Sequence, residues 1–311
     1  MTKLIERQVL LVKNEVSYGQ DSVPTAAANA IPVVEKPKIE FDAEVIERKH
    51  PFHSMSKLKP IVGKKYTKLG FKVEYCGSGT ATTAPRIGDL WEGCGFSEAV
   101  GASDVTYTPA SASLKSNSIY SYIDGALYKI LGSVGNMKIS GKAGTPVYFD
   151  FEVSGLYQDD SDASIVTPTF ESNFKNPPQA LSAVFTLDSV TTFVLREFNI
   201  DMGIPIIKRE DMSAAHGYAG FYCGKRNPTG NIIIEAPTKA TYDFLDKFET
   251  ATEIAASLVI GATAGNILTI TLPKITFTNV GIEEADGLVV VNIPISINMN
   301  TGNDEIALKH S

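Results

Sequence analysis

Residues 63–75, GKKYTKLGFKVEY, show the alternation of apolar and polar side chains that is typical of a strand with one buried face. Leu69, Phe71 and Val73 fall on one face, and the residues between them fall on the other. Residues 224–236, GKRNPTGNIIIEA, begin with the same Gly-Lys pair and end in a second strand-like run. The chain therefore contains two similar β-rich segments.

The similarity extends upstream of these two segments. The sequence KIEFDAEVIERK at residues 38–49 resembles NIDMGIPIIKRE at residues 199–210. The matched positions share an offset of 161: Arg48 and Arg209 (209 − 48), Gly63-Lys64 and Gly224-Lys225 (224 − 63), and Glu74 and Glu235 (235 − 74). An internal repeat of this length predicts two copies of a domain-sized unit.

The elements that follow keep the same order in both copies. The first copy predicts a helix with one apolar face made of Ile87, Leu90, Trp91 and Cys94, and the second repeats the spacing with Thr241, Phe244, Leu245 and Phe248 at an offset of 154 (245 − 91). Each helix precedes a predicted hairpin, at Asp124-Gly125 and at residues 261–266. Each copy ends in an alternating strand, with Phe151 matched to Val291 at an offset of 140 (291 − 151). The offset falls because loops shorten while strands persist.

We therefore predict a mainly β protein with two tandem antiparallel β-sandwich or barrel domains, each with one flanking α-helix. The expected boundaries are an N-terminal arm at 1–37, a first domain at 38–157, a linker or surface excursion at 158–190 and a second domain at 191–311. The arm is rich in Pro and small residues, which favours extended backbone. It is either a floppy tail or a segment that orders against a neighbouring subunit.

The composition limits the classes of function. Of the 311 residues, 43% are hydrophobic and 20% are charged, so a packed core is feasible. The net charge of −7 argues against a nucleic-acid-binding protein, which normally carries a basic excess. Cys76, Cys94 and Cys223 match no metal-binding spacing and are expected to be reduced thiols made in a cytosol. The N-terminus is a poor signal peptide, and no apolar run approaches the length of a membrane span.

The motifs of nucleotide-binding and hydrolytic sites are absent from the sequence. The closest match to a phosphate-binding loop has five residues between Gly135 and Gly141, and Ala143 follows Lys142 where the motif needs a hydroxyl. The G-x-S-x-G pattern that carries the nucleophile of many hydrolases does not occur.

The candidate metal ligands in the sequence do not form a metal-binding motif either. His50 and His53 flank a proline and have no third ligand nearby, while His216 and His310 are isolated. The acidic run at residues 159–162 lacks the Gly and the distal Glu of a calcium loop. We predict no catalytic, cofactor-binding or metal-binding residues, and hence that the protein is not an enzyme.

Residues 48–68 form a basic segment without any acidic residue. Its seven basic residues are Arg48, Lys49, Lys57, Lys59, Lys64, Lys65 and Lys68. Three interpretations stay open: a solvated loop, a nucleic-acid contact, and docking on an acidic surface of another subunit such as Asp159–Asp162 or Glu283-Glu284. The nucleic-acid interpretation lacks support because only Phe52 and Tyr66 are available to stack on bases.

The chain resembles the major tail tube proteins of long-tailed (siphovirus-type) bacteriophages over residues 15–305. The residues that carry the resemblance are E-x-x-Y-G at Glu15–Gly19 with the Pro/Ala-rich run after it, GKKYTKLGFKVEYCGSGTATTAPRIGDLWEGCGF at 63–96, SIYSYIDGALYKILGSVGNMKISGKAGTPVYFDFEVSGLY at 118–157, GNILTITLPKITFTN at 265–279, DGLVVVNIPISI at 286–297 and NTGNDE at 300–305. Their order over the chain is more specific than any one of them.

The resemblance implies a structural virion protein of two tail-tube domains that forms stacked rings around a lumen through which phage DNA is ejected. Because family members usually supply one domain to a six-membered ring, two domains per chain predict a homotrimer ring with pseudo-sixfold symmetry; the alternative is a homohexamer. The partners implied are the chain itself and the tail terminator, tape measure and distal tail proteins. DNA would pass in transit without sequence-specific binding, and no membrane would be involved.

Two other functions compete with the tube subunit. One is a tail terminator or connector ring, which would stack on one face only. The other is a β-sandwich receptor-binding tail module, which would not need ring geometry. All three place the protein in the viral tail after its synthesis in the host cytoplasm.

Overall fold

The computed structural model describes residues 4–311 and confirms a mainly β, antiparallel fold with two short helices. The strands are β1 (Gln8–Asn14), β2 (Ala30–Ile31), β3 (Lys38–Ile46), β4 (Ile61–Glu74), β5 (Phe96–Val100), β6 (Val105–Pro109), β7 (Asn117–Ile123), β8 (Ala126–Lys142), β9 (Tyr148–Leu156), β10 (Ser161–Asp162), β11 (Val184–Leu187), β12 (Leu195–Asp201), β13 (Ile206–Glu210), β14 (Tyr218–Cys223), β15 (Thr229–Glu235), β16 (Ile254–Ile260), β17 (Leu268–Phe277), β18 (Gly281–Ala285), β19 (Leu288–Asn298) and β20 (Ala307–His310). The helices are α1 (Ile87–Gly93) and α2 (Phe244–Glu249), and a 3-10 turn, η1, spans Ser172–Lys175.

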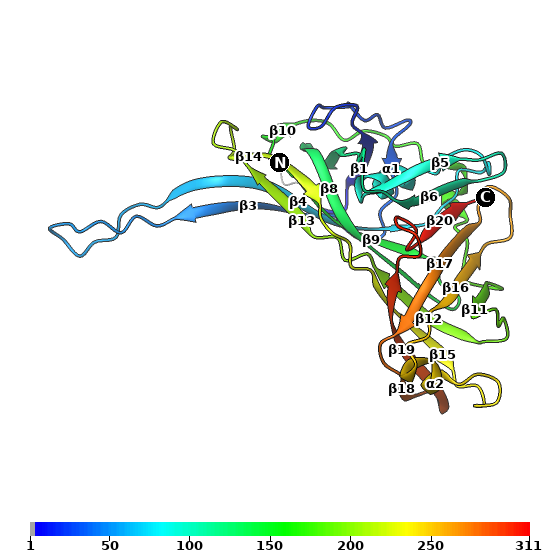
Figure 1. Ribbon diagram of the computed structural model, residues 1–311. Helices are drawn as coiled ribbons and strands as arrows, with labels where there is room; N and C mark the ends of the chain where they lie inside the picture. Colours follow the sequence, from blue (N-terminus) through cyan, green and yellow to red (C-terminus); the bar gives the residue numbers. More distant parts are fainter. Residues whose placement is uncertain (1–3) are drawn as a thin grey trace.

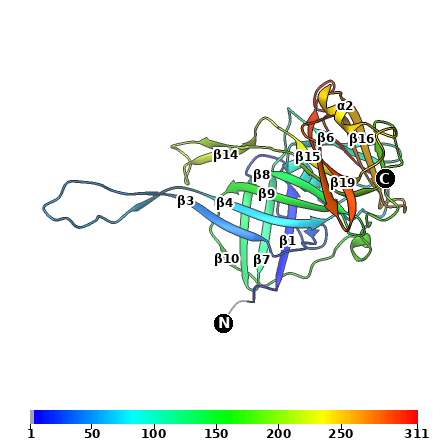
Figure 2. The same ribbon diagram turned by 90° about the horizontal axis from the view of Figure 1, so that it is seen from below.

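Eight strands form one continuous sheet, which we call the long sheet. Their order is β3-β4-β9-β8-β12-β15-β19-β18, and every neighbouring pair is antiparallel. Figure 2 shows the strands of this sheet crossing the body of the molecule from β3 and β4 to β15 and β19. Within the described chain, β3 pairs only with β4 and β18 only with β19, so the sheet has a free edge at each end.

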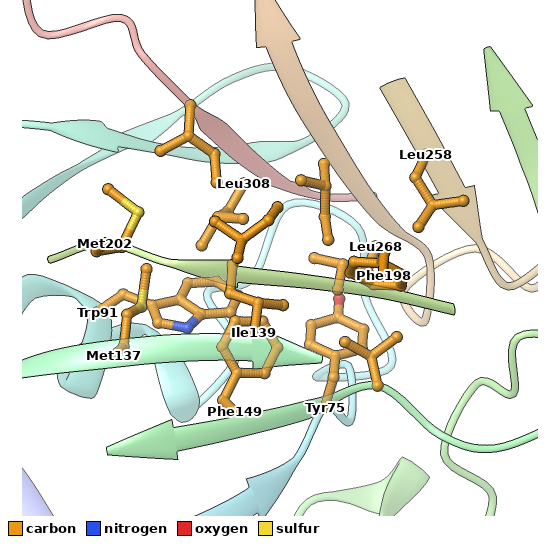
Figure 3. Close-up of a cluster of buried hydrophobic side chains, with 14 of the residues drawn as sticks. Tyr75, Trp91, Met137, Ile139, Phe149, Phe198, Met202, Leu258, Leu268 and Leu308 are labelled. Carbon is orange, nitrogen blue, oxygen red and sulfur yellow. The ribbon is translucent and has the colours of Figure 1, made fainter. Parts of the chain in front are cut away.

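Two groups of strands outside the long sheet cover its apolar face, whereas the β13–β14 hairpin packs against Tyr66 and Val134 on the other face. β1, β7 and the first half of β8 pack on one half, and β11, β16 and the first half of β17 pack on the other. The buried side chains between these layers form one cluster that runs through both halves. Figure 3 shows Tyr75, Trp91 and Phe149 of the first half beside Phe198 and Leu308 of the second. The two halves therefore share a core.

The same pattern of strand pairing occurs twice in the chain. The pairs β1–β7, β7–β8, β8–β9, β9–β4 and β4–β3 have counterparts in β11–β16, β16–β17, β17–β19, β19–β15 and β15–β12. The register repeats as well. Lys38 lies opposite Gly70 as Asn199 lies opposite Asn231, and both members of the pair keep the offset of 161 (199 − 38 and 231 − 70).

The register corrects one match that the sequence predicted. Phe151 lies opposite Phe71, and Ile293 lies opposite Ile232, which matches Phe71 at the offset of 161 (232 − 71). Phe151 therefore corresponds to Ile293 at an offset of 142 (293 − 151), and not to Val291 at 140. Because side chains alternate along a strand, an error of two positions kept the predicted buried face unchanged.

Two segments outside the expected domains contain strands of the repeated pattern. Residues 8–14, expected within an arm, form β1, which pairs with β7 of the same chain and buries its apolar residues from Val9 to Val12. Within the expected linker, β11 pairs with β16 as β1 pairs with β7. β1 therefore begins the first half, and β11 begins the second half.

The two helices differ in burial although the same apolar spacing predicted both. Around α1, the predicted face is buried as expected. In α2 only Phe244 is buried, whereas Leu245 is 51% and Phe248 37% exposed. The predicted apolar face of α2 is therefore largely uncovered in the single chain, because no other segment of the described chain covers these two side chains.

Candidate functional site

The hairpin formed by β3 and β4 projects far from the body of the molecule (Figures 1 and 2). Large apolar side chains are exposed along it: Val45, Ile46, Phe52, Met55, Ile61 and Val62, with exposed fractions from 42% to 107%. Apolar side chains gathered in this way on a soluble protein mark an interaction surface. The hairpin is therefore the first candidate surface for assembly.

The basic segment at 48–68 occupies the tip and one arm of this hairpin. Lys57 pairs with Glu47 at 2.5 Å, Lys64 with Glu210 at 2.6 Å and Lys68 with Asp42 at 2.8 Å, while the Lys65 ammonium lies 3.7 Å from the centre of the Tyr157 ring. In the part of the chain that the structure describes, Arg48, Lys49 and Lys59 form no ion pair. These three cations are the ones available to a partner. Tyr66 is buried, so it is not available to stack on bases.

We expect reversal of the free tip charges, Arg48→Glu with Lys49→Glu and Lys59→Glu, to shorten self-assembled structures about tenfold. Each reversed contact with an acidic partner costs on the order of 1 kcal/mol, and the costs add over the repeated contacts of an assembly. Particle length measured by electron microscopy tests this. The matched control is Arg48→Gln with Lys49→Gln and Lys59→Gln, which removes the charges without reversing them. Unchanged length in the reversed variant would contradict docking on an acidic surface.

The second hairpin, β13–β14, packs back onto the body, where Tyr18 holds it. The backbone N–H of Phe221 donates to Tyr18 Oη at 2.6 Å, and Tyr18 Oη donates to the Gly132 carbonyl at 2.9 Å. Tyr222 stacks on the Tyr18 ring with 5.7 Å between centroids. Burial raises the pKa of Tyr18, which keeps this hydroxyl protonated. Tyr18, the Tyr of the E-x-x-Y-G motif, therefore connects the N-terminal segment to the second half.

The Glu of the same motif is buried and accepts hydrogen bonds from four groups. Its carboxylate accepts from Ser116 Oγ at 2.6 Å, Ser118 Oγ at 2.9 Å and the N–H groups of Gly132 and Gly19 at 2.8 and 2.7 Å. A buried carboxylate is stable only when its oxygens are satisfied in this way. Glu15 therefore fixes the end of β1 to β7 and β8. Residue patterns alone did not assign it this role.

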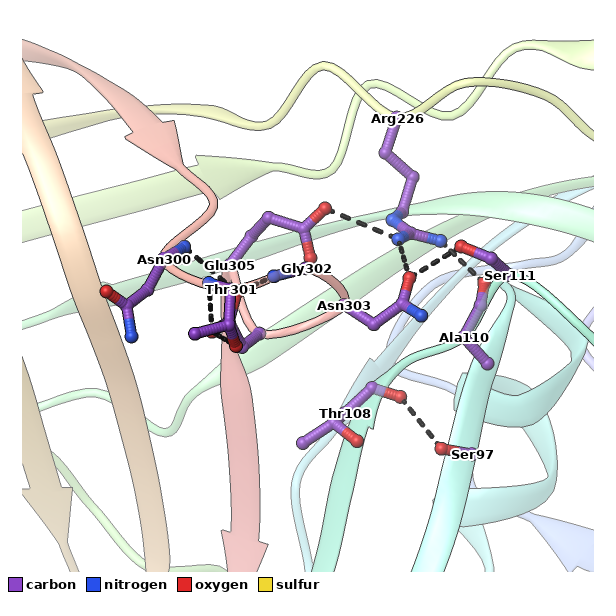
Figure 4. Close-up of polar contacts among 11 residues, drawn as sticks. Ser97, Thr108, Ala110, Ser111, Arg226, Asn300, Thr301, Gly302, Asn303 and Glu305 are labelled. Atoms are coloured by element: carbon purple, nitrogen blue, oxygen red, sulfur yellow. Dashed lines mark hydrogen bonds and ion pairs between the residues drawn. The ribbon is translucent and has the colours of Figure 1, made fainter.

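A guanidinium clamp joins the two halves at another point (Figure 4). Arg226 donates to the Ala110 carbonyl at 2.6 Å and to Asn303 Oδ1 at 2.9 Å, and it pairs with Glu305 at 3.3 Å. The loop that carries Asn303 is held by Asp304, which accepts from the N–H groups of residues 300, 301 and 302. A hydrogen bond from the Thr301 hydroxyl at 2.7 Å, together with these N–H bonds, lowers the pKa of Asp304. The NTGNDE motif therefore helps to form the joint between the halves.

An arrangement of His, Tyr and Ser that resembles a catalytic group has a structural role. His310 lies between Tyr75 Oη at 2.7 Å and Ser78 Oγ at 3.0 Å. The Ser78 hydroxyl can donate to the carbonyls of Thr80 and Thr83, at 2.8 and 2.7 Å, so its proton is not committed to the imidazole. Burial lowers the pKa of His310. This chain of polar groups ties β20 of the second half to the end of β4.

The other candidate ligands are scattered. His50 and His53 lie in the exposed tip of the β3–β4 hairpin, and His216 packs against the Tyr157 ring. Among residues 4–311, no group of three or more His, Cys, Asp or Glu side chains is placed to hold a metal ion. Cys76, Cys94 and Cys223 are free thiols, and burial raises the pKa of Cys223 to about 11.

One carboxylate pair on α1 makes the stability depend on pH. Burial, together with the neighbouring Glu92, raises the pKa of Asp89 to about 6. Ionised Asp89 therefore destabilises the folded chain above pH 6, and this cost disappears as the pH falls towards the unfolded value near 4. We expect Asp89→Asn to raise the free energy of unfolding by about 1–3 kcal/mol at pH 8 and by much less at pH 4. Urea titrations at both pH values test this; an equal effect at both would contradict it.

The polar face of the long sheet carries a mixed but acidic set of charges. Side chains alternate along the paired strands, which shows which charged residues lie on this face of the body, where β3 is counted from Glu40 towards Lys38. The basic residues are Lys38, Lys68, Lys72, Lys138 and Lys142. The acidic residues are Glu40, Glu74, Asp150, Glu152, Glu197, Asp201, Glu235 and Glu283. Five basic and eight acidic residues give a net charge of −3 (5 − 8). Three of the lysines pair with acids on this face: Lys38 with Glu40 at 2.6 Å, Lys72 with Asp150 at 3.7 Å and Lys138 with Asp201 at 3.4 Å.

Free sheet edges and exposed apolar hairpin residues on an antiparallel β subunit are features of a protein that associates with other chains. The chain belongs to the phage tail tube protein family, which it matches over residues 6–299. A comparison with curated proteins found no match.

Membership of this family gives the protein a structural role in the tail of the virion, where it assembles into a tube with other tail proteins. The family is a structural one and is not known for catalysis. In residues 4–311, no helix has both the length and the apolar character needed to cross a membrane.

Proposed function

We propose that three copies of this chain form a ring of pseudo-sixfold symmetry and that stacked rings form the conduit for phage DNA. The observation that carries the proposal is the repeated pairing pattern, which gives each chain two sets of four strands in one long sheet. Three chains would close a barrel of 24 strands (3 × 8). Closure would remove both free edges of every chain, which otherwise invite uncontrolled pairing.

The two halves then act as two tube domains of one chain. We place the first domain at 4–157, including β1, and the second at 184–311, beginning with β11. Residues 158–183 connect them over the surface. A homohexamer of the same chain would contain twelve tube domains, which makes it the alternative with the larger lumen.

The polar face of the long sheet is the proposed lumen wall. Its net charge of −3 per chain suits a conduit that must let DNA pass, because a cationic wall would hold phosphates through counterion release. The exposed β3–β4 hairpin is the proposed contact between stacked rings, with Arg48, Lys49 and Lys59 as its charged part. The tail terminator, tape measure and distal tail proteins are the proposed partners at the tube ends and in its lumen.

A terminator or connector ring is the second candidate function. The same free sheet edges would serve it, but it would stack on one face only. A receptor-binding module is disfavoured because it has no need for free edges at both ends of a sheet.

Negative-stain microscopy of the purified protein tests the proposal. We expect long hollow tubes whose end views average to sixfold density, and a mass per ring of three chains by native mass spectrometry. Single rings that never stack would favour the terminator function, and persistent monomers at high concentration would overturn the tube proposal. Six chains per ring would overturn the trimer alone.

A further inference from the structure

The joint between the two halves of the chain is a strand pair, which we call the internal seam. In it, β12 pairs with the last part of β8, with Asn199 opposite Ser140 and Ile200 opposite Ile139. Charged residues flank these pairs. Glu197 lies opposite Lys142 and Asp201 opposite Lys138, and the latter two side chains form an ion pair at 3.4 Å. Acids therefore line β12 and bases line β8.

The two free edges of the long sheet correspond to the two strands of the internal seam. Lys38 on β3 corresponds to Asn199 on β12, because their partners Gly70 and Asn231 are matched at the same offset of 161 (231 − 70). On the other edge, Ile282 lies opposite Val291, and Ile139 lies opposite Phe149. Val291 matches Phe149 at the offset of 142 (291 − 149), so Ile282 corresponds to Ile139. β18 is therefore the counterpart of the end of β8, without a counterpart of β12 beside it.

Burial at corresponding positions shows what the second half lacks. Ile139 is fully buried, whereas Ile282 is 72% exposed. Val147, which accepts from the Tyr75 N–H, is also fully buried, whereas Val289, which accepts from the corresponding Ala236 N–H, is 57% exposed. In the first half, Ile139 lies opposite Ile200 of the second half, and both Ile139 and Val147 belong to the core that the two halves share. The same apolar positions are open in the second half, where the described residues 4–311 place no further half beside β18.

We propose that β3 of a second copy of this chain pairs antiparallel with β18, with Lys38 opposite Glu283 and Ile39 opposite Ile282. This interchain seam rests on the proposed function and repeats the internal seam residue by residue. It places the partner's first half beside Ile282 and Val289, as the second half lies beside Ile139. The occupant of the open edge is thus a copy of the same chain.

The interchain seam brings a base and an acid together as the internal seam does, with the base on β3 and the acid on β18. In the interchain seam the bases Lys36 and Lys38 lie on or just before β3, and the acids Glu283 and Glu284 lie on β18. In the same register, β3 placed on β8 would set Lys36 opposite Lys142 but Glu40 opposite Lys138, whereas β3 placed on β18 sets Lys38 opposite Glu283. Like charges across an interface suppress the wrong pairing more than opposite charges add affinity. The Lys38–Glu283 pair therefore favours the interchain seam, and the contact of Lys36 with Lys142 disfavours β3 on β8.

Disulfide trapping tests the register. We expect Lys38→Cys combined with Glu283→Cys to give covalent oligomers under oxidation, ending at a closed three-chain species on non-reducing gels. The matched control is Asn199→Cys with Ser140→Cys, the corresponding pair of the internal seam, which must give an intrachain bond and no oligomer. Lys38→Cys with Ala285→Cys, two positions out of register, should cross-link about tenfold more slowly.

Charge exchange tests the seam without a covalent bond. Lys36→Glu with Lys38→Glu should reduce the tube fraction about tenfold, and so should Glu283→Lys with Glu284→Lys. All four changes in one chain should restore tubes, because every seam regains opposite charges. An equimolar mixture of the two double variants should not restore three-membered rings, since an odd ring cannot alternate two kinds of chain; restoration by mixing would indicate an even ring.

These experiments separate the seam from the function on which it rests. If the wild-type chain forms tubes but the Cys pair does not cross-link and both charge-reversed variants assemble normally, the proposed seam is wrong and the tube function stands. If the wild-type chain forms neither rings nor tubes, the proposed function fails first. Cross-linking to a closed trimer, with rescue by the fourfold variant, supports both.

Discussion

Trp91→Ala lowers the free energy of unfolding of the single chain by about 3–5 kcal/mol, the largest stability loss that we expect from one substitution. Trp91 is fully buried, and its ring lies 4.8 Å from that of Tyr107 and 5.2 Å from that of Phe149. Truncation to Ala leaves a cavity in the part of the core that both halves share, where surrounding strands are fixed by their ladders and cannot collapse into the space.

The counterpart in α2 provides the matched control. Leu245 was matched to Trp91 by the helical spacing, yet it is 51% exposed. We expect Leu245→Ala to cost less than about 1 kcal/mol in the single chain, because little apolar area is uncovered. Urea unfolding of both variants, in the Lys36→Glu/Lys38→Glu background that keeps chains apart, measures the difference. Equal losses of unfolding free energy would show that α2 is packed as α1 is, and would contradict the exposure of apolar positions in the second half.

The sequence predicted the strands whose two faces differ. Leu69, Phe71 and Val73 alternate with polar residues because one face of β4 meets the core and the other meets water. β1 was missed for the opposite reason: Val9 to Val12 are all buried, so its sequence shows no alternation. β11 has only four residues, too few for a period to stand out from the irregular segment around it.

The candidate surfaces were less predictable than the strands. The basic segment was visible as a run of charge, but which of its cations have partners depends on contacts such as Lys64 with Glu210, 146 residues away. The role of Glu15 depends on donors from β7 and β8, more than a hundred residues distant. Side-chain spacing reports local periodicity and does not report such long-range contacts. The free edge of β18 became visible only once the pairing of the two halves could be compared.

Reversing three acids on the polar face of the long sheet turns the proposed lumen into a DNA-binding surface. Asp150→Lys, Glu152→Lys and Glu235→Lys together change the charge of this face from −3 to +3 per chain (−3 + 6). We expect assembled tubes of this variant to retain double-stranded DNA that wild-type tubes do not hold. Each phosphate neutralised by a lysine releases a counterion, so the retention should weaken steeply with added salt.

The matched control for this prediction removes the charges without reversing them. Asp150→Asn, Glu152→Gln and Glu235→Gln bring the face to neutrality with nearly the same side-chain shapes. Binding of a short labelled duplex to preformed tubes, measured between about 50 and 200 mM salt, should fall by several powers of ten for the lysine variant if six or more phosphates are contacted. Capped tubes expose only their outer wall to the DNA. Retention of DNA by the lumen wall should therefore also require open tube ends. Reversed tubes that bind no DNA, or that bind it equally when capped, would place the polar face of the long sheet outside the lumen.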